Sequence, residues 1–171
     1  MRTRDRWDLA WRARPPEEAS NFNPAFCGEM IYRAAAAYHG LRDLPFSLAL
    51  TFLVLPIILH KPTRDQLPKK ANATFVGWAA EHGGLLAGLP DRATRLLPVS
   101  REALLFLLQN GVMRIQQGGI VVGENPIRVS ARPSAVTGET DEARRSAGLL
   151  GRWFANQGQA TSIMGVLGVA P

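Results

Sequence analysis

Residues 98–122 constrain the fold more than any other stretch of this chain. Their sequence, PVSREALLFLLQNGVMRIQQGGIVV, begins with a helical pattern in which Ser100 can cap the amino end. An Asn-Gly pair then supplies residues that tolerate positive φ and commonly end helices. Two β-prone runs, 112–116 and 120–122, follow on either side of a Gln-Gly-Gly turn. The stretch therefore predicts a helix that leads directly into a β-hairpin.

A helix followed by a hairpin is the arrangement of the last helix and the wing in a winged helix-turn-helix domain. Helical patterns over residues 75–81 and 85–97 precede it, which gives the three-helix run that such a domain requires. A further helix is expected over residues 139–155. The predicted fold class is mainly α with a small β-hairpin, a winged helix-turn-helix-like core with additional helices.

The first part of the chain divides into an arm and the start of the domain. Residues 1–22 are expected to form a basic N-terminal arm, and residues 23–171 a single helical, winged-helix-like domain. Asn23 is a good cap and Pro24 a good first position for a helix that extends to about residue 38.

The most hydrophobic stretch, residues 44–59 (LPFSLALTFLVLPIIL), is expected to be a central core helix. It is shorter than the roughly 20 residues that a helix needs to cross a bilayer, and Pro56 interrupts it. We therefore expect no membrane partner.

The charge and the cysteine content narrow the possible partners and compartment. The net charge of +6 makes an anionic partner plausible, and most of the cations are Arg, which suits ion pairs, protein interfaces and phosphates alike. Cys27 is the chain's single cysteine, so an internal disulfide is excluded and a reducing, cytoplasmic compartment is indicated. Cys27 lies within an apolar stripe, where a packing role is expected rather than a nucleophilic one.

The side chains of the predicted helix and hairpin over residues 98–122 indicate whether they could contact DNA bases. Residues 103–108 are all apolar, which predicts a helix buried nearly all round. The hairpin offers one cation, and its tip is uncharged. These features favour a scaffold that contacts protein over direct base reading. In the DNA-binding alternative, basic side chains of the helix, hairpin and connector would contact phosphates: Lys61, Lys69, Lys70, Arg101 and Arg114.

The N-terminal arm combines aromatic and basic residues. Trp7 and Trp11 are four residues apart and would share one face of a helix, beside several arginines. Exposed Trp and Arg are typical of protein-interface anchors, although both rings could instead fold back on the domain. The residues expected to contact a protein partner are Trp7, Trp11, Arg12, Arg14 and, in the basic connector, Arg64.

The sequence lacks the patterns that indicate catalysis or cofactor binding. Its histidines have no second ligand at a metal-binding spacing, and no phosphate loop, dinucleotide fingerprint or nucleophile elbow occurs. No cofactor, metal or catalytic residue is therefore predicted, and the chain is not expected to be an enzyme. A hydrolase would require a cleft that joins His60 or His82 to a carboxylate.

Four blocks together resemble a known family. They are NPAFCGEMIYRAAAAYHG, FLVLPIILHKPTRDQLP, PVSREALLFLLQNGVM and LLGRWFANQGQATSIMGVLGVAP, and they span residues 23–171. In their order and their amino-acid sequences they are similar to the middle component of bacterial three-component ABC (ABC-3C) systems. The resemblance implies a small accessory subunit that works with an SMC- or Rad50-like ABC ATPase and an effector, commonly a nuclease. Such systems resemble Lamassu-type antiphage defence, in which this subunit would be an adaptor or regulator without chemistry of its own.

Overall fold

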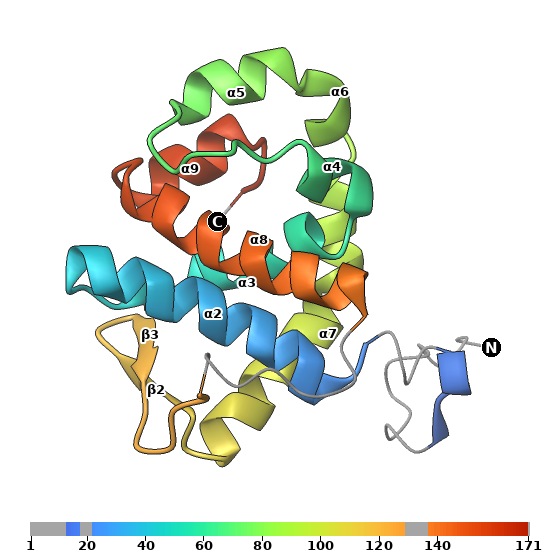
Figure 1. The fold of residues 1–171 in the computed structure, drawn as a ribbon, viewed down its shortest axis with the longest axis vertical. Helices are drawn as coiled ribbons and strands as arrows, with labels where there is room; N and C mark the ends of the chain where they lie inside the picture. Colours follow the sequence, from blue (N-terminus) through green and yellow to red (C-terminus); the bar gives the residue numbers. More distant parts are fainter. Residues whose placement is uncertain (1–12, 18–21, 129–136, 171) are drawn as a thin grey trace.

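The computed structural model describes residues 13–17, 22–128 and 137–170. Over these residues the chain is mainly helical, with one small antiparallel sheet of three strands. Figure 1 shows α2 and α8 side by side across the middle of the molecule, with the hairpin at one end and α4 to α6 at the other. The helices are α2 (Pro24–Arg42), α3 (Leu48–Ile58), α4 (Lys61–Asp65), α5 (Phe75–Glu81), α6 (Gly83–Leu86), α7 (Leu89–Gln109), α8 (Gly138–Ala155) and α9 (Ala160–Val166), and the strands are β1 (Phe46–Ser47), β2 (Met113–Gln116) and β3 (Gly119–Val122).

Helix α2 begins as the sequence predicts. The Asn23 side chain accepts a hydrogen bond from the Ala25 amide at 2.8 Å, and Pro24 occupies the first turn. The helix continues beyond residue 38, because Asp43 is the residue that adopts the left-handed conformation at its end. Helix α2 packs against α8 along one side and against α7 along another, so it is the central helix of the fold.

Helix α3 is the predicted core helix, and most of its side chains are buried. Pro56 lies inside it without ending it. The residues just before α3 form β1, which pairs with β3. Within the ranges that the structure describes, no helix is long and apolar enough to cross a membrane.

The prediction that Ser100 caps a helix is wrong. Helix α7 runs unbroken for 21 residues from Leu89, with Pro98 in its interior. Pro90 sits in the first turn, where proline is favoured because its missing N–H would have no partner there. Ser100 is fully buried along the helix instead, so residues 89–97 and the helix predicted from residue 98 form one helix, while residues 85 and 86 belong to α6.

The predicted hairpin is confirmed. Gln117 and Gly118 both have positive φ, 48° and 77°, which is the pattern of a type I′ turn and matches the twist of paired strands. Strand β3 lies between the other two strands, which gives the order β1-β3-β2. Gly119 lets β1 approach, because a Cβ there would stand 2.6 Å from the carbonyl oxygen of Phe46.

Aromatic side chains join α5 to the end of α8. The rings of Phe75 and Trp153 have centroids 4.7 Å apart, and Trp78 meets Trp153 edge-on at 5.1 Å. The indole N–H of Trp153 donates to the carbonyl oxygen of Ala73 at 2.7 Å, which satisfies its buried polar atom. This cluster fixes the α4 to α6 end of the molecule on the central helices.

Candidate partner-binding site

The outward side of α7 is more apolar than a solvated helix face. Ala103 and Leu107 are fully buried, but Leu105 is 54% exposed and Phe106 is 37% exposed. The prediction that residues 103–108 are buried nearly all round is therefore wrong, because α2 and α3 pack against α7 without covering Leu105 and Phe106. Arg101 is exposed one turn before Leu105.

The hairpin that follows α7 also carries exposed residues. Ile115 on β2 is 57% exposed, and Arg114 next to it is also exposed. Figure 1 shows the last turn of α7 and the hairpin together at one end of the molecule. We use the name α7–hairpin surface for the exposed residues in the second half of α7 and on β2, of which Arg114 and Ile115 point to opposite faces of the hairpin: Arg101, Leu105, Phe106, Arg114 and Ile115.

Arg14 connects the end of the arm to α7. Its guanidinium lies 2.6 Å from the Glu102 carboxylate, and its side chain is only 5% exposed. Glu102 occupies the turn of α7 that precedes Leu105 and Phe106. The arm therefore joins the domain at the edge of the α7–hairpin surface. The predicted contacts Trp7, Trp11 and Arg12 lie outside the described residues.

Arg64 is held inside the fold. Its side chain is 3% exposed, and it donates to the carbonyl oxygen of Ile58 at 2.8 Å. It also pairs with Glu139 at 3.3 Å and with Glu142 at 3.6 Å. Arg64 thus joins the ends of α3 and α4 to the start of α8. This geometry gives the guanidinium a role in the fold, and its predicted contact with a partner stays a prediction.

The basic residues that were predicted to contact nucleic acid do not lie on one surface. Lys61 pairs with Asp65 at 3.0 Å and with Glu142 at 3.6 Å, and the hydrogen bond that its ammonium donates to Asp65 raises the pKa of Lys61. Lys69 and Lys70 are exposed in the connector after α4. Arg101 lies instead on α7 and Arg114 on β2, and both are exposed.

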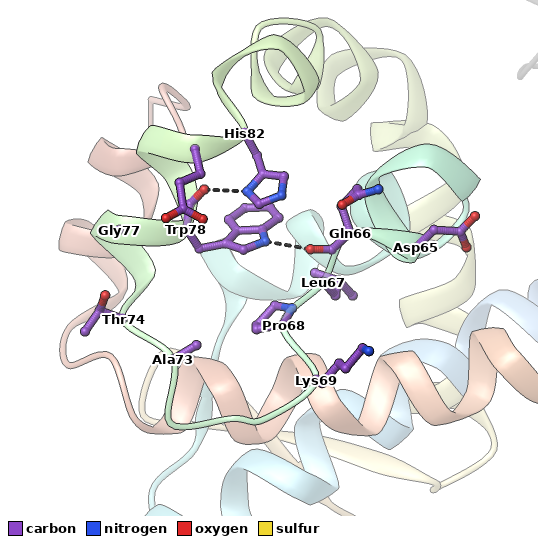
Figure 2. A pocket seen from close by; sticks show the side chains of 11 residues that line it. Asp65, Gln66, Leu67, Pro68, Lys69, Ala73, Thr74, Gly77, Trp78 and His82 are labelled. Carbon is purple, nitrogen blue, oxygen red and sulfur yellow. Dashed lines mark hydrogen bonds between the residues drawn. The ribbon is translucent and has the colours of Figure 1, made fainter.

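Lys69 borders a cavity between the connector and α5, shown in Figure 2. The cavity has a volume of about 440 Å³, and Trp78 and His82 form one wall with their rings stacked 4.9 Å apart. The indole N–H of Trp78 donates to the carbonyl oxygen of Gln66 at 2.7 Å. His82 Nδ1 lies 2.7 Å from the carbonyl oxygen of Trp78, so this nitrogen carries the proton and donates it. These bonds hold the two rings in place.

The cleft that a hydrolase would need is only partly formed. His82 lines the cavity together with Asp65 and Glu81, but no hydrogen bond joins its ring to either carboxylate among the described residues. His60 is used differently, because its Nδ1 accepts from the Thr63 amide and caps α4. Burial and the nearby Arg92 lower the pKa of His60, which keeps the ring neutral for this acceptor role.

The thiol of Cys27 is inert in this environment. Its side chain is fully buried on α2, and burial together with the negative charge of Glu102 raises its pKa to about 12. The thiolate that a nucleophile or a metal site requires is thus strongly disfavoured. In the part of the chain that the structure describes, no group of His, Cys, Asp and Glu is arranged to hold a metal ion.

Sequence reasoning missed the exposed apolar residues of the candidate site. A continuous apolar run gives no periodicity from which exposed positions could be separated from buried ones. Alternation along β2 gives no correct signal for Ile115 either, because it places Ile115 on the same side as the buried Met113 although Ile115 is exposed.

Comparison with known proteins identifies one family. The family described as ABC-three component (ABC-3C) system Middle Component 3 matches residues 11–171, which is nearly the whole chain. No curated protein and no solved structure matches this chain.

Proposed function

We propose that this chain, which belongs to the ABC-3C Middle Component 3 family, is a non-enzymatic adaptor within its system. A middle component of a multi-component ABC system works with partner proteins. In the proposal, those partners are an SMC- or Rad50-like ABC ATPase and an effector subunit, with a nuclease as the expected effector. The complex would act in antiphage defence of the Lamassu type, and this chain would couple the ATPase to the effector.

The proposal includes a winged-helix interpretation of the core. The order α2, β1, α3, α7, β2, β3 alternates helices and strands as a winged helix does, and the antiparallel order β1-β3-β2 places the first strand against the wing. Helix α7 then corresponds to the recognition helix. Residues 59–88, which contain α4 to α6, are an insertion between α3 and α7 in this interpretation.

The observation that carries the adaptor proposal is the chemistry of the α7–hairpin surface. A DNA-reading helix presents Arg, Lys, Asn or Gln to base edges. Here Leu105, Phe106 and Ile115 are exposed at the corresponding place. Apolar and aromatic side chains with Arg at the edge are typical of the centre and rim of protein interfaces. We therefore propose that this surface binds protein.

The test is co-expression of the tagged chain with the ATPase and the effector encoded beside it. Wild-type protein is expected to retain both components through purification. Leu105→Asp plus Ile115→Asp is expected to lose one of them, because a carboxylate buried at an interface without a partner is strongly unfavourable. The variant should stay folded, since both side chains are more than half exposed.

A matched control places the same change elsewhere. Val76 and Val166 are also exposed, on α5 and α9 at the other end of the molecule. Val76→Asp plus Val166→Asp is expected to retain both components. Equal loss in both double variants, or recovery of neither component with the wild-type chain, would contradict the proposal.

A second candidate function is binding of duplex DNA by this chain. It is favoured by the exposure of Lys69, Lys70, Arg101 and Arg114, none of which has an acidic partner within the described ranges. In this case duplex affinity should fall steeply with salt, and Lys69→Glu plus Lys70→Glu should weaken it. Absence of duplex binding at low salt would exclude this alternative.

A further inference from the structure

A pocket opens between the start of α2 and the start of α8. Its volume is about 640 Å³. Apolar side chains from three parts of the fold line it: Phe22, Phe26, Leu59 and Ala143. Arg64 and Glu139 line it as well. We call this site the α2–α8 pocket.

The side chains of the pocket are complementary to an indole. Arg64 supplies a guanidinium group that is fixed in the fold, because its side chain is 3% exposed and donates to the carbonyl oxygen of Ile58. Glu139 supplies a carboxylate that is 70% exposed and can accept a further hydrogen bond. Aromatic rings pack well on Phe22 and Phe26. Among aromatic side chains, tryptophan is the strongest partner for a cation, and its ring N–H acts only as a donor.

The fold already buries two tryptophans in this manner. Trp78 is 7% exposed and Trp153 is 1% exposed, and both rings lie beside the ring of Phe75. Their indole N–H groups donate to the carbonyl oxygens of Gln66 and Ala73, each at 2.7 Å. Phenylalanine rings and one hydrogen-bond acceptor are thus the surroundings that tryptophan takes in this protein. The α2–α8 pocket offers the same combination.

The ion pair of Arg14 limits how far the arm can lie from the pocket. Arg14 is held on α7 by Glu102. Phe22, at the pocket, follows Arg14 by eight residues, which span at most about 28 Å even when fully extended. Residues 16 and 17 are helical, which shortens this span. Trp11 precedes Arg14 by three residues, so their Cα atoms are within about 10 Å of each other.

We propose that the indole of Trp11 docks in the α2–α8 pocket of its own chain, with its ring against Phe22 and Phe26 and its N–H directed to Glu139. Trp11 fits this role better than Trp7, because a short tether to Arg14 gives a higher effective concentration at the pocket. The family match also begins at residue 11 and therefore includes Trp11 but not Trp7. The inference does not rest on the adaptor function.

The first test is fluorine NMR of the isolated full chain labelled with fluorotryptophan. Four signals are expected, and Trp7→Phe and Trp11→Phe assign two of them. Replacing water by heavy water shifts the signal of a fluorine atom that touches solvent. The shift of the Trp11 signal is expected to be as small as those of the buried Trp78 and Trp153, and far below its value in denaturant. A Trp11 shift equal to the denatured value would overturn the inference.

A change in the pocket tests where Trp11 docks. Phe22→Asp is expected to raise the solvent shift of the Trp11 signal towards its denatured value, because a carboxylate would then face the indole ring. Unchanged Trp78 and Trp153 signals would show that the variant is folded. Leu44→Asp is the matched control, an apolar-to-acidic change at a 52% exposed position beyond the other end of α2. Protection of Trp11 in both variants, or its loss in both, contradicts docking in this pocket.

A crosslink gives a second readout that leaves the pocket unchanged. A photocrosslinking phenylalanine derivative in place of Trp11 is expected to capture residues 22–26 or 139–143 of the same chain, identified in the monomer by mass spectrometry. This result decides the matter if Phe22→Asp does not fold. Capture confined to other segments would overturn the inference. Protection that disappears on dilution would also overturn it, because a second copy would then supply the indole.

The outcomes are separate from those of the adaptor proposal. Protection of Trp11 in a chain that retains neither the ATPase nor the effector supports the docking and overturns the adaptor function. A Trp11 that is exposed in the isolated chain and protected only in the complex overturns the docking. That second result would assign Trp11 to the partner interface, as the sequence of the arm predicts.

Discussion

Helix α2 meets its two main neighbours in different ways. Towards α8, Gly151 lies against the backbone of Ala34 so closely that a Cβ would overlap the carbonyl oxygen. Towards α7, Gly28 faces the side chain of Leu107, and a Cβ would stand 3.1 Å from its nearest atom. The backbone at Ala34 cannot move away from an added methyl group without shifting the helix, whereas the Leu107 side chain can change rotamer. The α2–α8 contact is therefore rigid, and the α2–α7 contact can adjust.

The largest expected effect is on the labelling rate of the Cys27 thiol. Cys27 is buried on α2, and Glu102 of α7 contributes to its environment. A pKa raised from 9.0 to about 12 lowers the thiolate fraction at pH 8 by about 1,000-fold, in addition to the steric protection from burial. Labelling by a disulfide reagent should thus be slower than in denaturant by at least that factor. Rapid labelling of the native protein would show that α7 separates readily from α2.

Gly151→Ala should break the rigid contact. The added methyl group forces α8 away from α2 over a long interface, and we expect a loss of about 3 kcal/mol or more in the free energy of unfolding, measured by urea denaturation. Gly148→Ala is the control on the same helix, because its Cβ would meet only Arg152 at an ordinary contact distance of 3.5 Å. That change should be neutral or stabilise by up to about 1 kcal/mol. Equal effects would contradict the comparison.

Glu29→Gln tests the ionic part of the α2–α8 contact. It leaves Arg33 and Arg144 without the carboxylate that both contact in a largely buried position. Partial exposure to solvent reduces the cost, so we expect a loss of about 1–2 kcal/mol. A double-mutant cycle with Arg144→Gln should show coupling, and simple additivity of the two losses would indicate that the pair contributes little.

Gly28→Ala should have the smallest effect. Leu107 must move by a few tenths of an ångström, and the gain in helix propensity of about 1 kcal/mol offsets that repacking. The free energy of unfolding should therefore stay within about 1 kcal/mol of wild type. A loss as large as that of Gly151→Ala would show that the two sides of α2 are equally rigid.

The parts of the fold that the sequence predicts are those set by local chemistry. The Asn23 cap, the Gly111 helix end and the Gln117-Gly118 turn each follow from what one or two residues do to their own backbone. The start of α7 was missed, because Pro98 and Ser100 form a convincing local start signal inside a longer helix. Strand β1 has only two residues, too few for any periodicity.

The candidate site was harder to predict because burial depends on distant parts of the chain. Arg64 looks like any other cation of a basic connector, yet the carbonyl oxygen of Ile58 and the start of α8 enclose it. Leu105 and Phe106 look like core residues, yet no element covers them over the described part of the chain. Arg33 and Arg152 line one groove only because α2 lies beside α8.

The length of α7 has a mechanical consequence. As one unbroken helix of 21 residues, it is a rod about 30 Å long that starts beside α6 and ends at the hairpin. A tilt of about 10° at Leu89 would carry Gln109 through about 5 Å, simply by leverage over that length. A movement of the α4 to α6 end that tilted α7 in this way would therefore displace the hairpin by about 5 Å.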